Sequence, residues 1–161
     1  MKIIIATHNK HKLAEMARIL EPMGYEVVTD RDLGIELTDV EENGKTFYEN
    51  ALIKAKTVSN ALSLPALADD SGICVEALGD EPGIYSARYA GDGVDKHNNE
   101  LLLKNMQGKE NRRAKFVCCM VYYSQDGEII TATGETFGEI LFAPEGENGF
   151  GYDPIFYSYD L

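Results

Sequence analysis

The stretch Leu67-Ala68-Asp69-Asp70-Ser71-Gly72 places two adjacent carboxylates directly after a short apolar run. We predict that the apolar run is a strand, that Asp69 and Asp70 form a corner, and that residues 73–75 are a second short strand. Burying two carboxylates is costly unless a cation or hydrogen bonds compensate them. A hard divalent cation such as Mg2+ prefers oxygen ligands, so the pair is a candidate metal or catalytic site. The alternative is an acidic turn, where Asp, Ser and Gly are common.

Composition is typical of a globular protein made of one domain. The chain has 161 residues, of which 44% are hydrophobic and 26% charged. No apolar run approaches the ~18 residues of a membrane helix, and residues 1–6 are too short for a signal peptide. Cys74, Cys118 and Cys119 show no CxxC spacing, which favours reduced core thiols. We therefore expect one domain over residues 1–161 and a cytoplasmic location.

The net charge of -12 argues against a protein that coats nucleic acid. A phosphorylated small molecule remains a possible ligand, because a few lysines and a metal ion can reverse the local field. The positions of the lysines are therefore more informative than their number.

The N-terminal residues predict a strand, a polar loop and a helix. Residues 2–6 contain three consecutive β-branched isoleucines at 3–5, and the apolar residues at 13, 16, 17 and 20 share one helix face. Thr7 or Asn9 could cap this helix beside Lys10 and Lys12, which would make its N-terminus a phosphate cradle. The alternative is a generic turn with exposed lysines, since the glycines of a Walker A or dinucleotide motif are absent.

A second helix is predicted to begin near Thr46, because Glu49 three residues later completes a capping box. Glu42 lies in the acidic turn before it, and Lys54 lies within it. One interpretation places these two side chains on opposite sides of one site, with the carboxylate on a metal ion and the ammonium on phosphate. The other is a solvated acidic loop followed by an ordinary helix.

The remaining pattern predicts an α/β fold with a mixed sheet. Residues 98–106 indicate a helix and residues 115–123 a central strand. Asp126-Gly127 predicts a turn into a strand over residues 128–133, antiparallel to the one before it. Near the end, Gly149-Phe150-Gly151-Tyr152-Asp153-Pro154 could admit a flat ligand that stacks on the aromatic ring, or could be an ordinary loop.

Together these motifs resemble the inosine triphosphate pyrophosphatases, also called non-standard purine NTP pyrophosphohydrolases. The resemblance covers nearly the whole chain, through five landmarks that occur in the family's order: residues 6–12, 41–55, 68–72, 82–91 and 149–154. It implies an elongated mixed β-sheet flanked by helices, two lobes around a central nucleotide cleft, and a homodimer.

The resemblance also implies roles for individual residues. Glu42 and Asp70 would ligate Mg2+, and Asp70 would orient or deprotonate the attacking water, with Lys54 as a second catalytic residue. Residues expected to contact the substrate are Thr7, His8, Asn9, Lys10, His11, Lys12, Lys54 and Ser71 on the phosphate side and Phe150, Gly151, Tyr152 and Asp153 around the base. The expected reaction is hydrolysis of ITP, dITP or XTP to the monophosphate and pyrophosphate.

The sequence departs from the family at its end. Family members continue by a few tens of residues, through a Ser-His-Arg motif that contributes base contacts, whereas this sequence stops at Leu161. Two alternatives to an active pyrophosphohydrolase follow. One is a nucleotide-binding remnant with weak or no catalysis, and the other is a structural module whose acidic corners are solvated turns.

Overall fold

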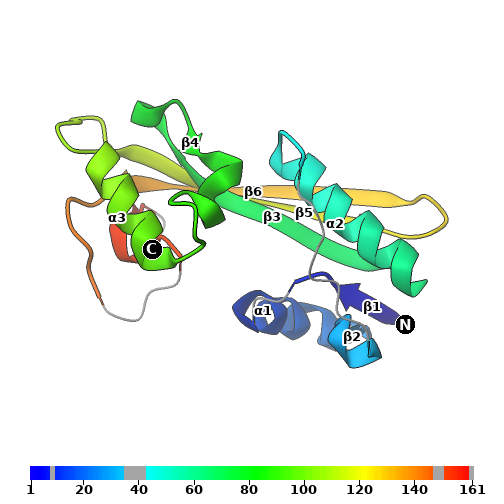
Figure 1. Cartoon of the computed structure of the whole chain (residues 1–161). Helices are drawn as coiled ribbons and strands as arrows, with labels where there is room; N and C mark the ends of the chain where they lie inside the picture. Colours follow the sequence, from blue (N-terminus) through cyan, green and yellow to red (C-terminus); the bar gives the residue numbers. More distant parts are fainter. Residues whose placement is uncertain (8–9, 35–42, 147–150, 160–161) are drawn as a thin grey trace. The chain divides into compact units, whose positions relative to one another are not determined.

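The structure is a computed structural model, and it describes residues 1–7, 10–34, 43–146 and 151–159. Within these ranges the strands form one sheet in the order β2-β1-β3-β5-β6-β7, with β4 paired to β3 (Figure 1). The strands are β1 (Lys2–Ile5), β2 (Glu26–Val28), β3 (Ala66–Val75), β4 (Glu81–Pro82), β5 (Arg113–Tyr123), β6 (Ile129–Ile140) and β7 (Phe156–Ser158). The α-helices are α1 (Lys10–Leu20), α2 (Phe47–Leu62) and α3 (Asp95–Asn105). Short 3-10 helices span Glu21–Met23, Arg31–Leu33, Glu76–Leu78, Gly83–Arg88 and Asp153–Ile155.

The sheet is mixed, which confirms the predicted α/β class. Strand β1 pairs in parallel with both β2 and β3, whereas β4 is antiparallel to β3 and β7 is antiparallel to β6. The chain divides into two compact units, Met1–Asp70 with Cys119–Thr133, and Ser71–Cys118 with Gly134–Leu161. The single domain predicted for residues 1–161 would include both units, and the predicted cleft between two lobes remains a prediction.

In the first unit, α2 packs on one face of the sheet because its small residues permit close approach. Ala51 and Ala55 are fully buried against Ala68 of β3 and Val121 of β5. The helix begins where the capping box predicts, since the Thr46 side chain accepts a hydrogen bond from the Glu49 amide. The Glu49 carboxylate accepts a hydrogen bond from the Lys45 amide, one residue earlier than a standard capping box would have it.

The second unit is built around α3 and the 3-10 helices. Its core contains Ile73, Leu102, Met106, Ile140 and Ile155, among other residues, and all of these five are at most 1% exposed. The guanidinium of Arg112 links the end of α3 to the end of β6, because it donates to the backbone carbonyls of Met106, Ile140 and Leu141 at 2.7–3.0 Å. Burial lowers the pKa of this guanidinium from its ordinary value.

Two predicted boundaries were wrong at the strands. Asp69 and Asp70 do not form a corner, since β3 runs unbroken from Ala66 to Val75. Strand β6 extends to Ile140, well beyond the predicted end at residue 133. Polar residues interrupt the apolar pattern from which both strands were predicted. A long strand can nevertheless include carboxylates and hydroxyls where tertiary contacts accommodate them. The predicted turn is confirmed: Gly127 has φ +90° and donates its amide to the Ser124 carbonyl.

Candidate functional site

Three parts of the first unit meet at the end of β1. The amide of Ala6 donates to the Leu67 carbonyl at 2.9 Å, so β3 lies beside β1 up to this point and then continues past it. Asp69 therefore lies just beyond the carboxyl end of a parallel strand, the position where open α/β sheets commonly bind ligands. Thr7, which follows this strand end, is half-buried.

The first contact at this place joins α1 to β3. The Nζ atom of Lys12 lies 2.7 Å from Oδ2 of Asp69 and donates a hydrogen bond to it. The Asp69 side chain is only 3% exposed, whereas that of Lys12 is 29% exposed. The ammonium thus compensates a buried carboxylate while keeping a solvent-accessible surface, which leaves it able to meet a ligand.

The second contact joins α2 to the same residue of β3. The Nζ atom of Lys54 donates to the backbone carbonyl oxygen of Asp69 at 2.7 Å. Lys12 and Lys54 are far apart in the sequence, yet both ammonium groups bind Asp69. The sequence prediction named both lysines, but it included Asp69 only as a member of the candidate carboxylate pair and gave it no individual role. Its position next to Asp70 was the signal that could have indicated a separate role. Adjacent residues of a strand point to opposite faces, so the two carboxylates have different surroundings.

Asp70 lies on the face of β3 opposite to Asp69. Alternation along a strand places it on the same face as Ala68, which packs against α2. The residue is 8% exposed and thus buried. Ser71, next along β3, is half-buried and belongs to the second unit.

The remaining predicted site residues fall into three groups. Lys10 and His11 begin α1 and are exposed. Gly151, Tyr152 and Asp153 belong to the second unit, where Tyr152 is buried and Asp153 is exposed. Four predicted residues lie outside the described residues, namely His8, Asn9, Glu42 and Phe150.

The turn before α2 is closely held to the helix. The Gly44 amide donates to Oδ1 of Asn50 at 2.8 Å, and Asn50 is only 2% exposed. A Cβ atom on Gly44 would lie 2.6 Å from Cβ of Glu49 and 2.8 Å from Oδ1 of Asn50, so a side chain does not fit there. This contact fixes the position of Gly44 against the helix that carries Lys54.

Of the two residues expected to bind a metal ion, the structure describes Asp70. In the part of the chain that the structure describes, no group of three or more His, Cys, Asp or Glu side chains is arranged to hold a metal ion. Glu42, the second expected ligand, is outside that part. The carboxylate of Asp70 is an oxygen donor of the type that Mg2+ binds, together with substrate phosphates and water.

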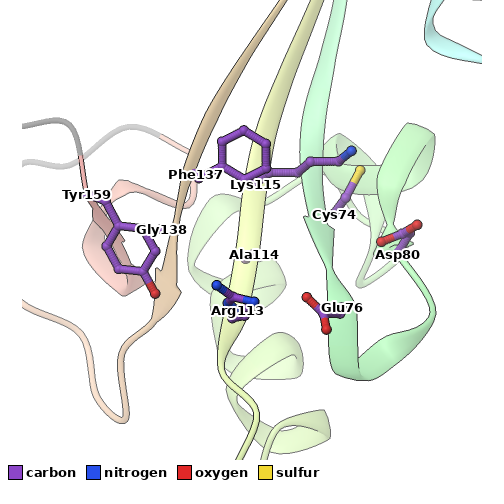
Figure 2. A pocket seen from close by; sticks show the side chains of 9 residues that line it. All are labelled: Cys74, Glu76, Asp80, Arg113, Ala114, Lys115, Phe137, Gly138 and Tyr159. Atoms are coloured by element: carbon purple, nitrogen blue, oxygen red, sulfur yellow. The ribbon is translucent and has the colours of Figure 1, made fainter.

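A separate pocket lies wholly within the second unit (Figure 2). It has a volume of about 340 Å³ and is bordered by strands β3, β5 and β6 and by Tyr159. Burial and the nearby carboxylate of Asp80 raise the pKa of the Cys74 thiol in its wall. None of the residues expected to bind substrate lines it.

Comparison with known proteins identifies the family. The model of the Ham1 family matches residues 3–160. The chain belongs to the Ham1 family. The resemblance to the non-standard purine NTP pyrophosphohydrolases is therefore confirmed. None of the helices that the structure describes combines the length and apolar character required to cross a membrane.

Several Ham1 relatives have an assigned activity in their names. The dITP/XTP pyrophosphatase of Haemophilus influenzae is 51% identical over 98% of this chain and 82% of its own length. That of Thermus thermophilus is 47% identical over 98% of this chain and 76% of its own length.

Solved Ham1 structures share the fold. The Ham1 protein of Staphylococcus aureus has a TM-score of 0.89 at 43% identity, over 99% of this chain and 82% of that one. The HAM1 protein of Coxiella burnetii also has a TM-score of 0.89, at 38% identity, over 98% of this chain and 81% of that one.

Proposed function

We propose that this protein hydrolyses non-standard purine nucleoside triphosphates, namely dITP, XTP and ITP, to the monophosphate and pyrophosphate, and so removes them from the nucleotide pool. The observation that supports this most is the convergence of Lys12 and Lys54 on Asp69, one residue before Asp70. The names of relatives that are about half identical to the chain supply the substrate class.

The charges at this place suggest a need for a divalent cation. Lys12 and Lys54 contribute two positive charges, and Asp69 and Asp70 contribute two negative charges, so the four groups together are neutral. A nucleoside triphosphate is strongly anionic, and its binding requires further positive charge. We propose that Asp70 and Glu42 hold Mg2+, which when bound would neutralise phosphate charge and lower the pKa of a nearby water.

The chain's own residues have distinct parts in the proposed reaction. Asp70 orients the attacking water and accepts its proton as the water oxygen bonds to the α-phosphorus. The bond between the α-phosphorus and the bridging oxygen breaks, and pyrophosphate leaves with that oxygen. Lys12 and Lys54 stabilise the charge that develops on the phosphate oxygens, and Asp69 holds both ammonium groups in place. Thr7, Asn9 and Ser71 are proposed to complete the phosphate contacts.

Residues 151–153 are proposed to contact the purine base. Gly151 permits close approach of a flat ring, and Asp153 is exposed and can accept hydrogen bonds from a base edge. We further propose a homodimer located in the cytoplasm. The described cysteines, Cys74, Cys118 and Cys119, are all free thiols, which is in keeping with a reducing compartment.

The direct test measures pyrophosphate release from dITP, XTP and ITP, with dATP and dGTP as comparison substrates, in the presence of Mg2+ and of EDTA. The proposal expects release from the first three substrates in Mg2+, at rates well above those for dATP and dGTP. Absence of release from all three would overturn it. A nucleotide-dependent rise in melting temperature without release would favour the alternative of a binding protein that lacks catalysis.

A further inference from the structure

The segment that carries Asp153 is held by side chains of α3, a helix for which the sequence suggested no role. The Gly151 amide donates to Oδ2 of Asp95 at 3.1 Å, and Nδ2 of Asn99 donates to the Gly151 carbonyl at 3.0 Å. Asp95 and Asn99 are one helical turn apart and so share a face. Both polar groups of one residue are therefore bound from the same helix, more than fifty positions away.

The rest of the segment is anchored at two further points. The hydroxyl of Tyr152 donates to the Ser86 carbonyl at 2.6 Å, and Tyr152 is 4% exposed. Ser86 is in turn tied to β3, because its hydroxyl accepts a hydrogen bond from the Ile73 amide at 2.9 Å. Ile155 is fully buried in the core of the second unit. Asp153 alone among residues 151–155 is exposed, between these fixed points.

Asn99 has a feature that packing does not explain. The residue is 8% exposed, and its Oδ1 atom is buried with no hydrogen-bond partner among the described residues. An unsatisfied buried acceptor has a desolvation cost that a leucine of similar volume would avoid. The hydrogen bond from the side-chain amide nitrogen to the Gly151 carbonyl is what an asparagine provides here and a leucine would not. Gly151 also has φ +59°, a conformation that glycine adopts without strain and that most other residues avoid.

We propose that Asp95 and Asn99 are positioning residues that fix the Gly151 peptide, and that they thereby hold Asp153 where it meets the purine base. This inference rests on the proposed function, because it takes from it the contact of residues 151–153 with the purine base. Neither residue is expected to touch the phosphates or the attacking water. Their loss should therefore weaken nucleotide binding and leave the chemical step unchanged.

The test compares Asn99→Leu and Asp95→Ala with the unaltered protein in steady-state hydrolysis of dITP. We expect KM to rise about tenfold in each variant, as expected for one lost hydrogen bond that orders the site, while kcat stays within about twofold. Asp95→Asn keeps an acceptor oxygen and should restore KM. Asn105→Leu is the matched control, since Asn105 is on the same helix and donates to the Tyr89 hydroxyl rather than to Gly151.

Two further measurements distinguish the proposed role of Asp95 and Asn99 from an effect on stability and from the proposed function. Asn99→Leu should unfold at an unchanged or higher urea concentration, whereas the Gly151 amide should exchange its hydrogen at least about tenfold faster in both variants. An unchanged KM, or a fall in kcat alone, would overturn the inference. If the unaltered protein released no pyrophosphate, the proposed function would fail. Independently of activity, unchanged hydrogen exchange at Gly151 in the variants would show that Asp95 and Asn99 do not fix the Gly151 peptide.

Discussion

Lys12 donates a hydrogen bond to the buried carboxylate of Asp69 at 2.7 Å, and Lys54 donates to the backbone carbonyl of the same residue at the same distance. One strand residue thus holds an ammonium group from each of two helices. The side chain and the backbone of Asp69 have separable parts in this arrangement, which makes it open to mutational dissection.

Replacing the Asp69 carboxylate should destabilise the fold. In Asp69→Asn the buried ion pair with Lys12 is lost, while the backbone carbonyl that binds Lys54 remains. We expect the free energy of unfolding to fall by about 1–3 kcal/mol in urea titrations. Glu135→Gln is the matched control, because the Glu135 pair with Lys115 is 3.5 Å long and about a third exposed on both sides, so its loss should change stability by less than about 0.5 kcal/mol. Equal effects would contradict this account.

Removing the Lys54 charge should impair turnover more than stability. Lys54→Met retains most of the side-chain volume but loses the ammonium group, so we expect kcat/KM for dITP to fall about a hundredfold. Lys56→Met provides the control, since Lys56 is exposed two residues further along α2. The measurement is steady-state pyrophosphate release. Similar activity in Lys54→Met and Lys56→Met would exclude Lys54 from the site.

Asp70→Asn should abolish turnover while nucleotide binding stays measurable. The amide is isosteric with the carboxylate but is a poor proton acceptor and a weak metal ligand, so we expect kcat to fall at least about a hundredfold. EDTA should reduce the unaltered protein to a similar rate, and added Mg2+ should restore it. Asp80→Asn is the control, because Asp80 is exposed with φ +70°, a conformation that Asn also adopts readily. Full activity of Asp70→Asn would remove Asp70 from the mechanism.

Two glycines of β6 should respond differently to the same change. A Cβ on Gly138 would lie 2.1 Å from the Tyr157 carbonyl oxygen and 2.7 Å from the Phe156 ring, whereas a Cβ on Gly134 meets nothing within 4 Å. Gly138→Ala should therefore lower the free energy of unfolding by about 1–3 kcal/mol by displacing β7. Gly134→Ala should be neutral or slightly stabilising. Urea unfolding of both variants checks this, and a stable Gly138→Ala would contradict the described packing.

The Tyr152 hydroxyl gives a prediction about pH. Burial raises the pKa of this phenol above its ordinary value, so the folded state favours the protonated form that donates to Ser86. The contribution of the Tyr152 hydroxyl to the free energy of unfolding is therefore complete below the pKa of tyrosine in the unfolded chain, about 10, and declines as the pH rises further. Tyr152→Phe should lose about 1 kcal/mol of unfolding free energy between pH 6 and 9. The difference from the unaltered protein should shrink above about pH 10, and growth of the difference there would contradict the assignment.

Much of the local structure was predictable because it depends on short-range patterns. The apolar spacing over residues 13–20 predicted the buried face of α1, on which Met16 is 8% exposed. Thr46 and Glu49 predicted the start of α2, and Gly127 the turn between β5 and β6. Each of these features depends on residues within a few positions of one another, so hydrophobic period and capping chemistry are sufficient.

Boundaries and partners were less predictable, for a common reason. The sequence placed a corner at Asp69 and Asp70, because adjacent carboxylates usually avoid the interior of a sheet. The strand continues there since Lys12 of α1 compensates the Asp69 charge. Likewise Asn50 is a polar residue of α2, yet it is buried and its side chain accepts a hydrogen bond from the Gly44 amide. Whether a polar side chain is buried depends on which group, distant in the sequence, lies within hydrogen-bond distance of it in the fold.

The sequence by itself determined the α/β class, the family and the residue types needed for phosphate and metal chemistry, because these are encoded in local periodicity and in motifs of fixed spacing. Only the tertiary structure decided that Asp69 binds both lysines and that Asp95 and Asn99 bind Gly151. Those contacts join residues 15 to 57 positions apart. They exist because strand register and helix packing bring the groups within hydrogen-bond distance, and no spacing along the chain specifies that.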